Sequence, residues 1–370
     1  MRPMTIFAFP ASRGRTGLAL AAAAVLAAPG AAAAAPGMSV VATGLDNPRH
    51  VQLAPDGTLY VAAAGKAGDT CMGRGEEQTC IGFSGRIAAI APGGSRARTV
   101  QGGLLSIGGP DGSFTIGPDG VSIGPDGRVF TVIASGTQEE VSAAPKRAQK
   151  QAGQLFRVLP QPLTSFASID SFEWKHNSDG VRGDTNSDPY DVLALEGRQI
   201  VADAGANAIL QVKGRKITLL ATIRGPGRPQ RVPTSLAQGP DGAIYVGELA
   251  EGAGTGKARV LKLGAAGTRP QVVESGFTAI TGIAFGPDGS LYVTELSTNL
   301  RKQSAPGRIT RIAPDGRRTS FSRGLVFPQG AAVAQNGDVY LSNFSVLPAS
   351  TPRRSPFRGA GGQIVKVTGL

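Results

Sequence analysis

The sequence contains few of the residues that bind transition metals. Its 370 residues include two cysteines and two histidines, His50 and His176, and it has no H-E-x-x-H motif. A zinc hydrolase of that type needs two histidines on one helix face, so we do not expect this function. Two cysteines with no histidine beside them also fall short of the four ligands of a closed zinc site.

Aromatic and charged residues are also scarce, at 5% and 17% of the chain, whereas hydrophobic residues make up 41%. This apolar content is enough to build a core, but the mixture is too even for a multi-span membrane protein. Beyond the N-terminal region no segment approaches ~18 uninterrupted apolar residues. We therefore expect no transmembrane segment after the N-terminal region is removed.

Positive charge exceeds negative charge, with 38 Lys and Arg against 26 Asp and Glu and a formal net charge of +12. The basic residues are scattered, and the densest stretches, residues 145–150 and 352–358, look like loops. Neither stretch carries the set of aromatic residues that stacks on single-stranded nucleic acid. We expect no nucleic-acid partner. The basic surface is either simply solvated or weakly attracted to an anionic cell-envelope polymer.

Residues 1–35 are predicted to be a signal peptide. Arg2, Arg13 and Arg15 precede the short apolar run at residues 17–28, and small residues of the A-x-A kind follow. The alternative is a permanent N-terminal anchor. Export to a secreted or extracytoplasmic location places Cys71 and Cys80 in an oxidising compartment, where we expect them to form one disulfide across a Gly-rich loop.

Glycine and proline are abundant, with 53 and 26 residues, and they mark a repeat. An apolar run, a Pro-Asp-Gly turn and a strand ending in an aromatic-Val pair recur at residues 51–65, 121–136, 235–249 and 283–296. Weaker copies lie at residues 192–205 and 332–344. The turn glycines fall at positions 57, 127, 197, 242, 289 and 337, so the spacings are 70, 70, 45, 47 and 48. Asp-Gly between alternating apolar runs is the signal of a tight hairpin.

Two further strands follow each hairpin except the last, which is followed by one. Units of about 40 to 50 residues with four short strands are typical of a β-propeller. The predicted fold is therefore an all-β, six-bladed propeller of antiparallel strands, formed by residues 38–370 as a single domain. The sixth unit lacks a fourth strand, and the unmatched strand at residues 38–45 is predicted to close it. The two spacings of 70 place insertions at the cysteine loop and at residues 135–152.

Residues 171–212, 232–249 and 276–296 resemble the ScyD/ScyE family of secreted bacterial propellers. The blocks that carry the resemblance are Asp-Pro-Tyr at 188–190, Ala-Asp-Ala-Gly-x-Asn at 202–207 and Pro-Thr-Ser at 233–235. Residues 186–190 read Asn-Ser-Asp-Pro-Tyr where the family more usually has Asp-Ser-Asn-Pro-Tyr. The chain is more distantly similar to NHL-repeat and gluconolactonase-like propellers. The resemblance implies the fold but little about function: namesake members are associated with scytonemin pigment clusters, and most members have no established activity.

Two rows of equivalent residues are candidates for the central channel. The first residues of the inner strands form the row His50, Gly120, Asp191, Ser235, Gly282 and Gly330. We interpret His50, Asp191 and Ser235 as polar channel lining with a possible binding role. A catalytic triad is disfavoured because these residues lie on separate blades and no G-x-S-x-G elbow is present.

The second row lies at the ends of the second strands and contains Asp203, Glu248, Glu295 and Asn343. Their oxygen atoms suit Ca²⁺ if the ring brings them around one centre. The alternative is that each side chain caps a loop of its own blade through backbone N–H groups. A loop with Asp179, Asp184 and Asp188 has the composition of a calcium loop but lacks the EF-hand spacing, and is interpreted as a solvated turn.

Three functional hypotheses follow. The first is a non-enzymatic, NHL-like binding protein, a monomer whose loops recognise an unknown small molecule or a protein or envelope partner, with no assigned catalytic residue. The second is a calcium-dependent lactonase or esterase in the central channel. The third is a structural extracellular module for assembly.

Overall fold

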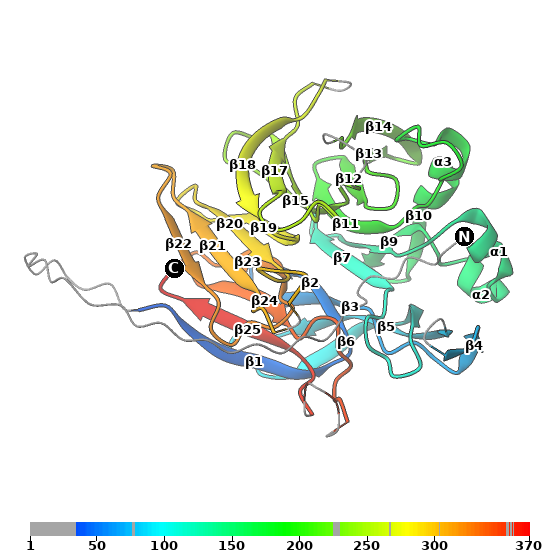
Figure 1. Cartoon of the computed structure of the whole chain (residues 1–370), viewed down its shortest axis with the longest axis horizontal. Helices are drawn as coiled ribbons and strands as arrows, with labels where there is room; N and C mark the ends of the chain where they lie inside the picture. The colour runs from blue at the N-terminus through cyan, green and yellow to red at the C-terminus, as the bar shows by residue number, and fades with distance from the viewer. Residues whose placement is uncertain are drawn as a thin grey trace, which may run out of the picture.

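A computed structural model describes residues 35–75, 78–224, 230–265, 268–302, 304–352, 355, 357 and 359–370. Its strands form six sheets arranged around a common axis, which is the predicted six-bladed propeller (Figure 1). The predicted signal peptide lies outside the described residues, apart from Ala35. In the described part of the chain, no helix is both long and apolar enough to cross a membrane.

In each blade we name the strands from the channel outward. Blade 1 contains β2 (Pro48–Leu53), β3 (Leu59–Ala63), β5 (Thr79–Ile90) and β6 (Ala97–Gly108), with the additional β4 (Thr70–Met72) beside β5. Blade 2 contains β7 (Pro118–Ile123), β8 (Val129–Ile133), β9 (Gln154–Leu159) and β10 (Thr164–Ser168). Blade 3 contains β11 (Pro189–Leu195), β12 (Arg198–Asp203), β13 (Ala208–Lys213) and β14 (Lys216–Thr222).

The remaining blades are more compact. Blade 4 contains β15 (Pro233–Gln238), β16 (Ile244–Glu248), β17 (Ala258–Lys262) and β18 (Gln271–Phe277). Blade 5 contains β19 (Ile280–Phe285), β20 (Leu291–Glu295), β21 (Arg308–Ile312) and β22 (Arg318–Phe321). Blade 6 contains β23 (Gln329–Val333), β24 (Val339–Asn343), β25 (Gly362–Thr368) and β1 (Gly37–Leu45).

The predicted closure of the ring is confirmed. Strand β1 pairs antiparallel with β25, from Gly37 opposite Thr368 to Leu45 opposite Gly362. This pairing covers the outer edge of β25, which would otherwise present unpaired backbone groups. Leu45 is fully buried and joins the core between blades 6 and 1.

The turns between the first and second strands of each blade share one geometry. The turn glycines predicted from the repeat all have positive φ, for example 85° at Gly57 and 76° at Gly242. In five of the six turns an Asp or Asn side chain accepts a hydrogen bond from the backbone two residues later, as Asp56 does from Thr58. Such turns combine glycine's freedom at positive φ with the local bonding of Asx side chains.

The two ends of the channel therefore carry different connections. Because consecutive strands are antiparallel, the short turns after the inner strands all lie on one face, which we call the hairpin face. The connections from second to third strands, and from each blade to the next, lie on the opposite face, which we call the loop face. An apolar core lies between each pair of neighbouring blades.

The insertions in the first two blades contain more regular structure than expected. The Cys71–Cys80 disulfide is present, but the cysteines lie opposite each other on paired strands β4 and β5 rather than in a loop. Residues 145–150, predicted to be a loop, include the short helix α2 (Lys146–Gln149). It follows α1 (Gln138–Ala143), whose start is fixed by a capping box between Thr137 and Glu140. The helix α3 (Ile169–His176) was not predicted.

Candidate functional site

A ring of polar side chains surrounds the channel near the loop face. It consists of one residue from the start of each inner strand: Arg49, Asp119, Tyr190, Thr234, Thr281 and Gln329. In five of the six blades a proline stands directly before this residue. Proline lacks a backbone N–H and suits the first position of a strand, so it places the next side chain at the same level in each blade. We call these six residues the polar ring.

Arg49 connects the first two blades within the polar ring. Its Nε lies 3.1 Å from Asp119 Oδ1, and its Nη2 donates to the carbonyl of Thr115. Both side chains are buried, and the Asp119 carboxylate oxygens have no hydrogen-bond partner apart from this ion pair. Burial raises the pKa of Asp119, and the charge of Arg49 opposes that rise. The pair is a buried ion pair that depends on Arg49 for compensation of the carboxylate.

A second buried carboxylate, that of Asp188, stands near this pair. Asp188 is 9% exposed, and its Oδ1 has no hydrogen-bond partner. Burial and the neighbouring charge of Asp119 raise the pKa of Asp188, whereas Arg49 lowers it. The sequence-based interpretation of Asp188 as part of a solvated turn is therefore wrong. The following Pro189 begins β11 and brings Asp188 to the polar ring. Two carboxylates and one guanidinium leave one negative charge, so the group favours uptake of one proton.

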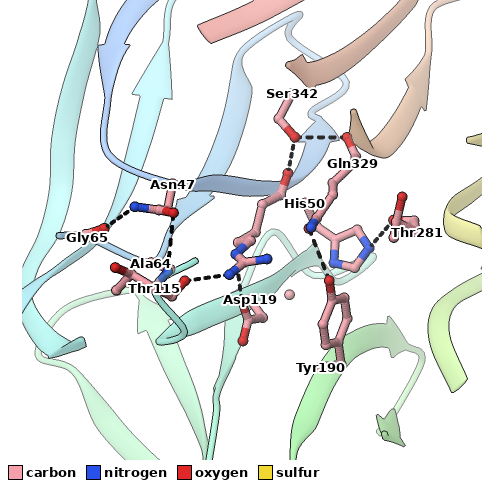
Figure 2. A network of polar contacts seen from close by, with 12 residues as sticks. Asn47, His50, Ala64, Gly65, Thr115, Asp119, Tyr190, Thr281, Gln329 and Ser342 are labelled. Carbon is pink, nitrogen blue, oxygen red and sulfur yellow. Dashed lines mark hydrogen bonds and ion pairs between the residues drawn. The ribbon is translucent and has the colours of Figure 1, made fainter. Parts of the chain in front are cut away.

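Other contacts of the polar ring cross the channel (Figure 2). Tyr190 of blade 3 donates through its hydroxyl to Gln329 Oε1 of blade 6, over 3.2 Å. His50 of blade 1 reaches the Thr281 carbonyl of blade 5, with Nε2 at 3.0 Å. The Ser342 hydroxyl, on the second strand of blade 6, donates to the carbonyl of Gln329 or of Arg49, which lie 3.0 and 2.8 Å away, and links that blade to blade 1. The contacts of Tyr190 and His50 span the channel near its loop-face end.

The contact of His50 with Thr281 fixes the position of one of its protons. Because a carbonyl oxygen only accepts, Nε2 must carry the proton that bonds Thr281. The other nitrogen, Nδ1, lies 3.5 Å from Asp191 Oδ1. Asp191 also accepts from the backbone N–H groups of Val192 and Leu236. Burial raises the pKa of Asp191, and His50 and these two N–H groups oppose that rise.

Ser235 does not complete a triad with His50 and Asp191. Its hydroxyl is buried and has no hydrogen-bond partner. The glycines of the same row have a steric role. A Cβ at Gly120 would lie 2.8 Å from Asp191 Cα, and one at Gly282 would lie 2.5 Å from the carbonyl carbon of Gly330. Neighbouring inner strands thus come into contact at this level.

The four residues considered for calcium each bond locally. Asp203 accepts from Ser187 and from the backbone N–H groups of Asp188 and Ala206. Glu248 is paired with Arg231 and Arg259. Glu295 accepts from the backbone of Thr278 and from Arg308, and Asn343 accepts from the backbone of Val326 and donates to Gly324. Burial raises the pKa of Asp203 to about 7.

These four residues do not fit a shared calcium ion. Each of the four side chains already accepts hydrogen bonds from its own blade or from the connection that leads into that blade. The charges of Glu248 and Glu295 are neutralised by arginines. Among the described residues, no three His, Cys, Asp or Glu side chains are grouped closely enough to hold a metal ion. Calcium binding at this row therefore stays a prediction without support in the geometry.

The rest of the channel forms a cavity of about 270 Å³ on the hairpin-face side. Its deepest residues are His50, Asp191 and Ser235, and it extends along the inner strands to their ends at Leu53 and Phe285. No described residue of the long connections lines it. The channel thus has a charged end crossed by side-chain contacts and an uncharged end that contains the cavity.

Sequence reasoning found the row of His50, Asp191 and Ser235 but missed the polar ring one residue earlier. The signal was present: a polar residue or tyrosine at each of six aligned positions, preceded by proline in five. What the sequence did not reveal was which of these side chains cross the channel.

Comparisons with known proteins agree with this architecture. Residues 184–346, fewer than half of the chain, match the model of the SMP-30/gluconolactonase/LRE-like region. No curated protein is significantly similar in sequence. Neither result tests the ScyD/ScyE resemblance, which stays a prediction.

Solved structures share the fold at very low sequence identity. A gluconolactonase from Xanthomonas campestris is 8% identical, with a TM-score of 0.52 over 90% of this chain and 89% of that chain. The PQQ-bound aldose sugar dehydrogenase from Streptomyces coelicolor is 14% identical, with a TM-score of 0.51 over 90% and 98%. A protein of unknown function from Bacteroides thetaiotaomicron is 10% identical, with a TM-score of 0.56 over 90% and 76%.

Proposed function

We propose that this protein is a gluconolactonase-like propeller that hydrolyses a lactone or ester at the loop-face end of its channel, in the extracytoplasmic space. The family-model match over residues 184–346 supports the reaction class. The disulfide between Cys71 and Cys80 and the predicted signal peptide support the location, because such bonds persist in oxidising compartments.

One observation carries the site: the unpartnered carboxylate oxygen of Asp188 beside the Arg49 and Asp119 pair. A carboxylate whose pKa is raised toward neutrality suits general acid–base catalysis. Asp188 would accept a proton from water as the water oxygen bonds to the ester carbonyl carbon. As the carbon–alkoxide bond breaks, Asp188 would return that proton to the leaving oxygen. The Arg49 guanidinium would stabilise the negative charge that develops on the carbonyl oxygen.

The gluconolactonase-like reaction class implies a divalent metal, but the residues that the structure describes do not fit one. The carboxylates at the ends of the second strands are bonded within their blades, and those of Asp119 and Asp188 number only two. The proposal therefore assigns the proton transfer to Asp188 and the charge stabilisation to Arg49.

The test is turnover of D-glucono-δ-lactone and of an aryl acetate, with EDTA and with millimolar calcium. We expect Asp188→Asn to lower kcat about 100-fold or more, because a general base contributes about 10²–10⁴. Glu251→Gln is the matched control, since Glu251 is a partly buried loop-face carboxylate outside the polar ring whose pKa burial also raises. Equal turnover in wild type and Asp188→Asn would refute the assignment of Asp188.

A second candidate is a non-enzymatic module that binds a partner with its loop face. The observation in its favour is an exposed aromatic side chain on this face beside a largely buried apolar cluster that includes Leu300, Phe327 and Leu347. Phe114, whose ring lies 6.4 Å from that of Phe327, is 40% exposed. Absence of turnover, together with a partner whose binding is lost in Phe114→Asp, would favour this candidate.

A further inference from the structure

The cavity at the hairpin face is separate from the proposed reaction site. Its inner end is lined by His50, Asp191 and Ser235, at the level where neighbouring inner strands touch at Gly120, Gly282 and Gly330. The links from Tyr190 to Gln329 and from His50 to Thr281 cross the channel in the same region. A molecule in this cavity must therefore enter and leave through the hairpin face.

The inner strands form the cavity wall. Every inner strand stands at one end of its sheet, so one of its edges is unpaired and six such edges converge on the channel. Several aliphatic side chains of these strands also pack into the cores between blades. Val51, Val121 and Leu236 are nearly fully buried and belong to three different cores between blades. An unpaired strand edge presents alternating N–H and C=O groups, which are uncharged donors and acceptors. Two of these N–H groups, those of Val192 and Leu236, already donate to Asp191.

The cavity offers no free charge. Of the residues that line it, only His50 and Asp191 carry titratable groups, and they face each other across 3.5 Å. Gln52 and Gln238, toward the ends of their strands, add uncharged amides near the mouth. A charged ligand would lose hydration here without meeting an opposite charge, which is costly. An uncharged ligand with several hydroxyl groups could instead replace its bonds to water with bonds to the strand edges.

We propose that this cavity is a second ligand site, which binds a small uncharged polyol through the free edges of the six inner strands. Its volume of about 270 Å³ is just below the ~300–1,000 Å³ of pockets for drug-sized ligands, which suits a molecule of this kind. The site is independent of Asp188 and of any hydrolytic activity.

Three compounds with one six-carbon skeleton test the chemical class: D-sorbitol, D-gluconate and D-glucamine. They differ at one terminal carbon, which is neutral, anionic or cationic at pH 7.5. Binding to the full mature protein is measured by isothermal titration calorimetry and by ligand-observed NMR. We expect sorbitol to bind and both charged analogues to bind about tenfold more weakly or not at all. Equal binding of all three, or no binding of sorbitol, would overturn the proposal.

Two substitutions test the face of entry. Gln238 is exposed at the end of β15, so Gln238→Trp should fold normally while obstructing the mouth. We expect it to weaken sorbitol binding at least tenfold. Phe114→Trp places the same bulk on the opposite face and should leave affinity within about twofold. The proposal fails if Phe114→Trp weakens binding and Gln238→Trp does not. Because sorbitol is not a hydrolase substrate, Asp188→Asn should bind it normally, which separates this result from the proposed function.

Discussion

The two ends of the central channel are built from the same six strands but differ in charge, burial and access. At the loop-face end, Arg49, Asp119 and Asp188 are buried charged groups, and Tyr190 and His50 make contacts across the axis. At the hairpin-face end, short turns leave a cavity of about 270 Å³. The difference follows the connections: long segments enter the strands at one end, and tight turns leave them at the other.

This comparison separates residues that hold the ring together from residues that contact solvent. The ion pairs of the hairpin face, such as Arg311 with Asp288, involve partly exposed side chains. The Arg49 and Asp119 pair is buried at 6% and 1% side-chain exposure. Exposed pairs contribute about 0–1 kcal/mol, whereas breaking a buried pair costs several kcal/mol. The free energy of unfolding should therefore depend more on the buried ion pair of the loop-face end than on the exposed ion pairs of the hairpin face.

The largest loss of stability should come from removing strand β1, because both ends of the channel depend on the closed ring. Deleting residues 37–45 uncovers the edge of β25 and removes Leu45 from the core between blades 6 and 1. Burial of one leucine contributes about 1.5–3 kcal/mol, and the unpaired edge promotes aggregation. We expect no cooperative thermal transition in the truncated protein, measured by circular dichroism. A truncated protein as stable as the mature chain would contradict the closure.

Arg49→Met should have the next largest effect, because it leaves Asp119 buried without a positive partner. We expect a loss of about 3–5 kcal/mol in the free energy of unfolding, measured by urea denaturation at pH 7.5. Arg311→Met, the control on the hairpin face, should cost about 1 kcal/mol or less. Adding Asp119→Asn to Arg49→Met should recover part of the loss. Equal effects of the two arginine substitutions would remove the distinction between the ends.

Much of the architecture could be predicted from the sequence, because it depends on local signals repeated six times. The Asp-Gly and Asn-Gly turns, the four strands per blade and the use of residues 38–45 to close the ring each follow from spacing. Helix α3 was missed because its polar residues give the segment the composition of a loop. Two of them, Asp170 and Glu173, are in fact buried in the helix.

The site was harder to predict because its contacts join distant blades. Asp188 lies in a stretch rich in Asp, Gly and Asn, which locally indicates a solvated turn. Its pKa is raised by burial and by the charge of Asp119 and lowered by Arg49, and these two residues are 69 and 139 positions away. No local pattern contains that information. The same holds for His50, whose contact with Thr281 spans 231 residues.

The pH dependence of stability should have opposite signs at the two ends. Burial raises the pKa of Asp203 on the loop face to about 7. The unfolded chain then releases this proton at lower pH than the folded protein, so stability falls as pH rises from about 4 to 7. Asp288 on the hairpin face has its pKa lowered to about 2 by Arg311, so its contribution is present above pH 4 and is lost as pH falls toward 2.

Asp203→Asn tests this sign. An Asn amide group can donate to Ser187 while its oxygen accepts from the backbone of Asp188 and Ala206, as protonated Asp203 would. We expect the variant to be about 2–4 kcal/mol more stable than wild type at pH 7.5 and equal to it near pH 4, by urea denaturation. Asp288→Asn should instead be the less stable variant at pH 7.5. A variant of Asp203 that is destabilised at both pH values would show that the ionised form is required.

The smallest loss of stability should come from removing the disulfide of the loop-face insertion in blade 1. Cys71 and Cys80 are nine positions apart, and β5 is already held by its pairing with β3 and β6. Closing a loop of this length stabilises a protein by about 2–3 kcal/mol in the chain-entropy account. Because the bond crosses strands that already pair, we expect Cys71→Ser with Cys80→Ser to cost about 1–2 kcal/mol. The mutant should keep the pH dependence and the buried charges of the channel, since its hairpin contributes no residue to the polar ring. A loss as large as that of Arg49→Met would mean that this hairpin, as well as the polar ring, holds the loop-face end closed.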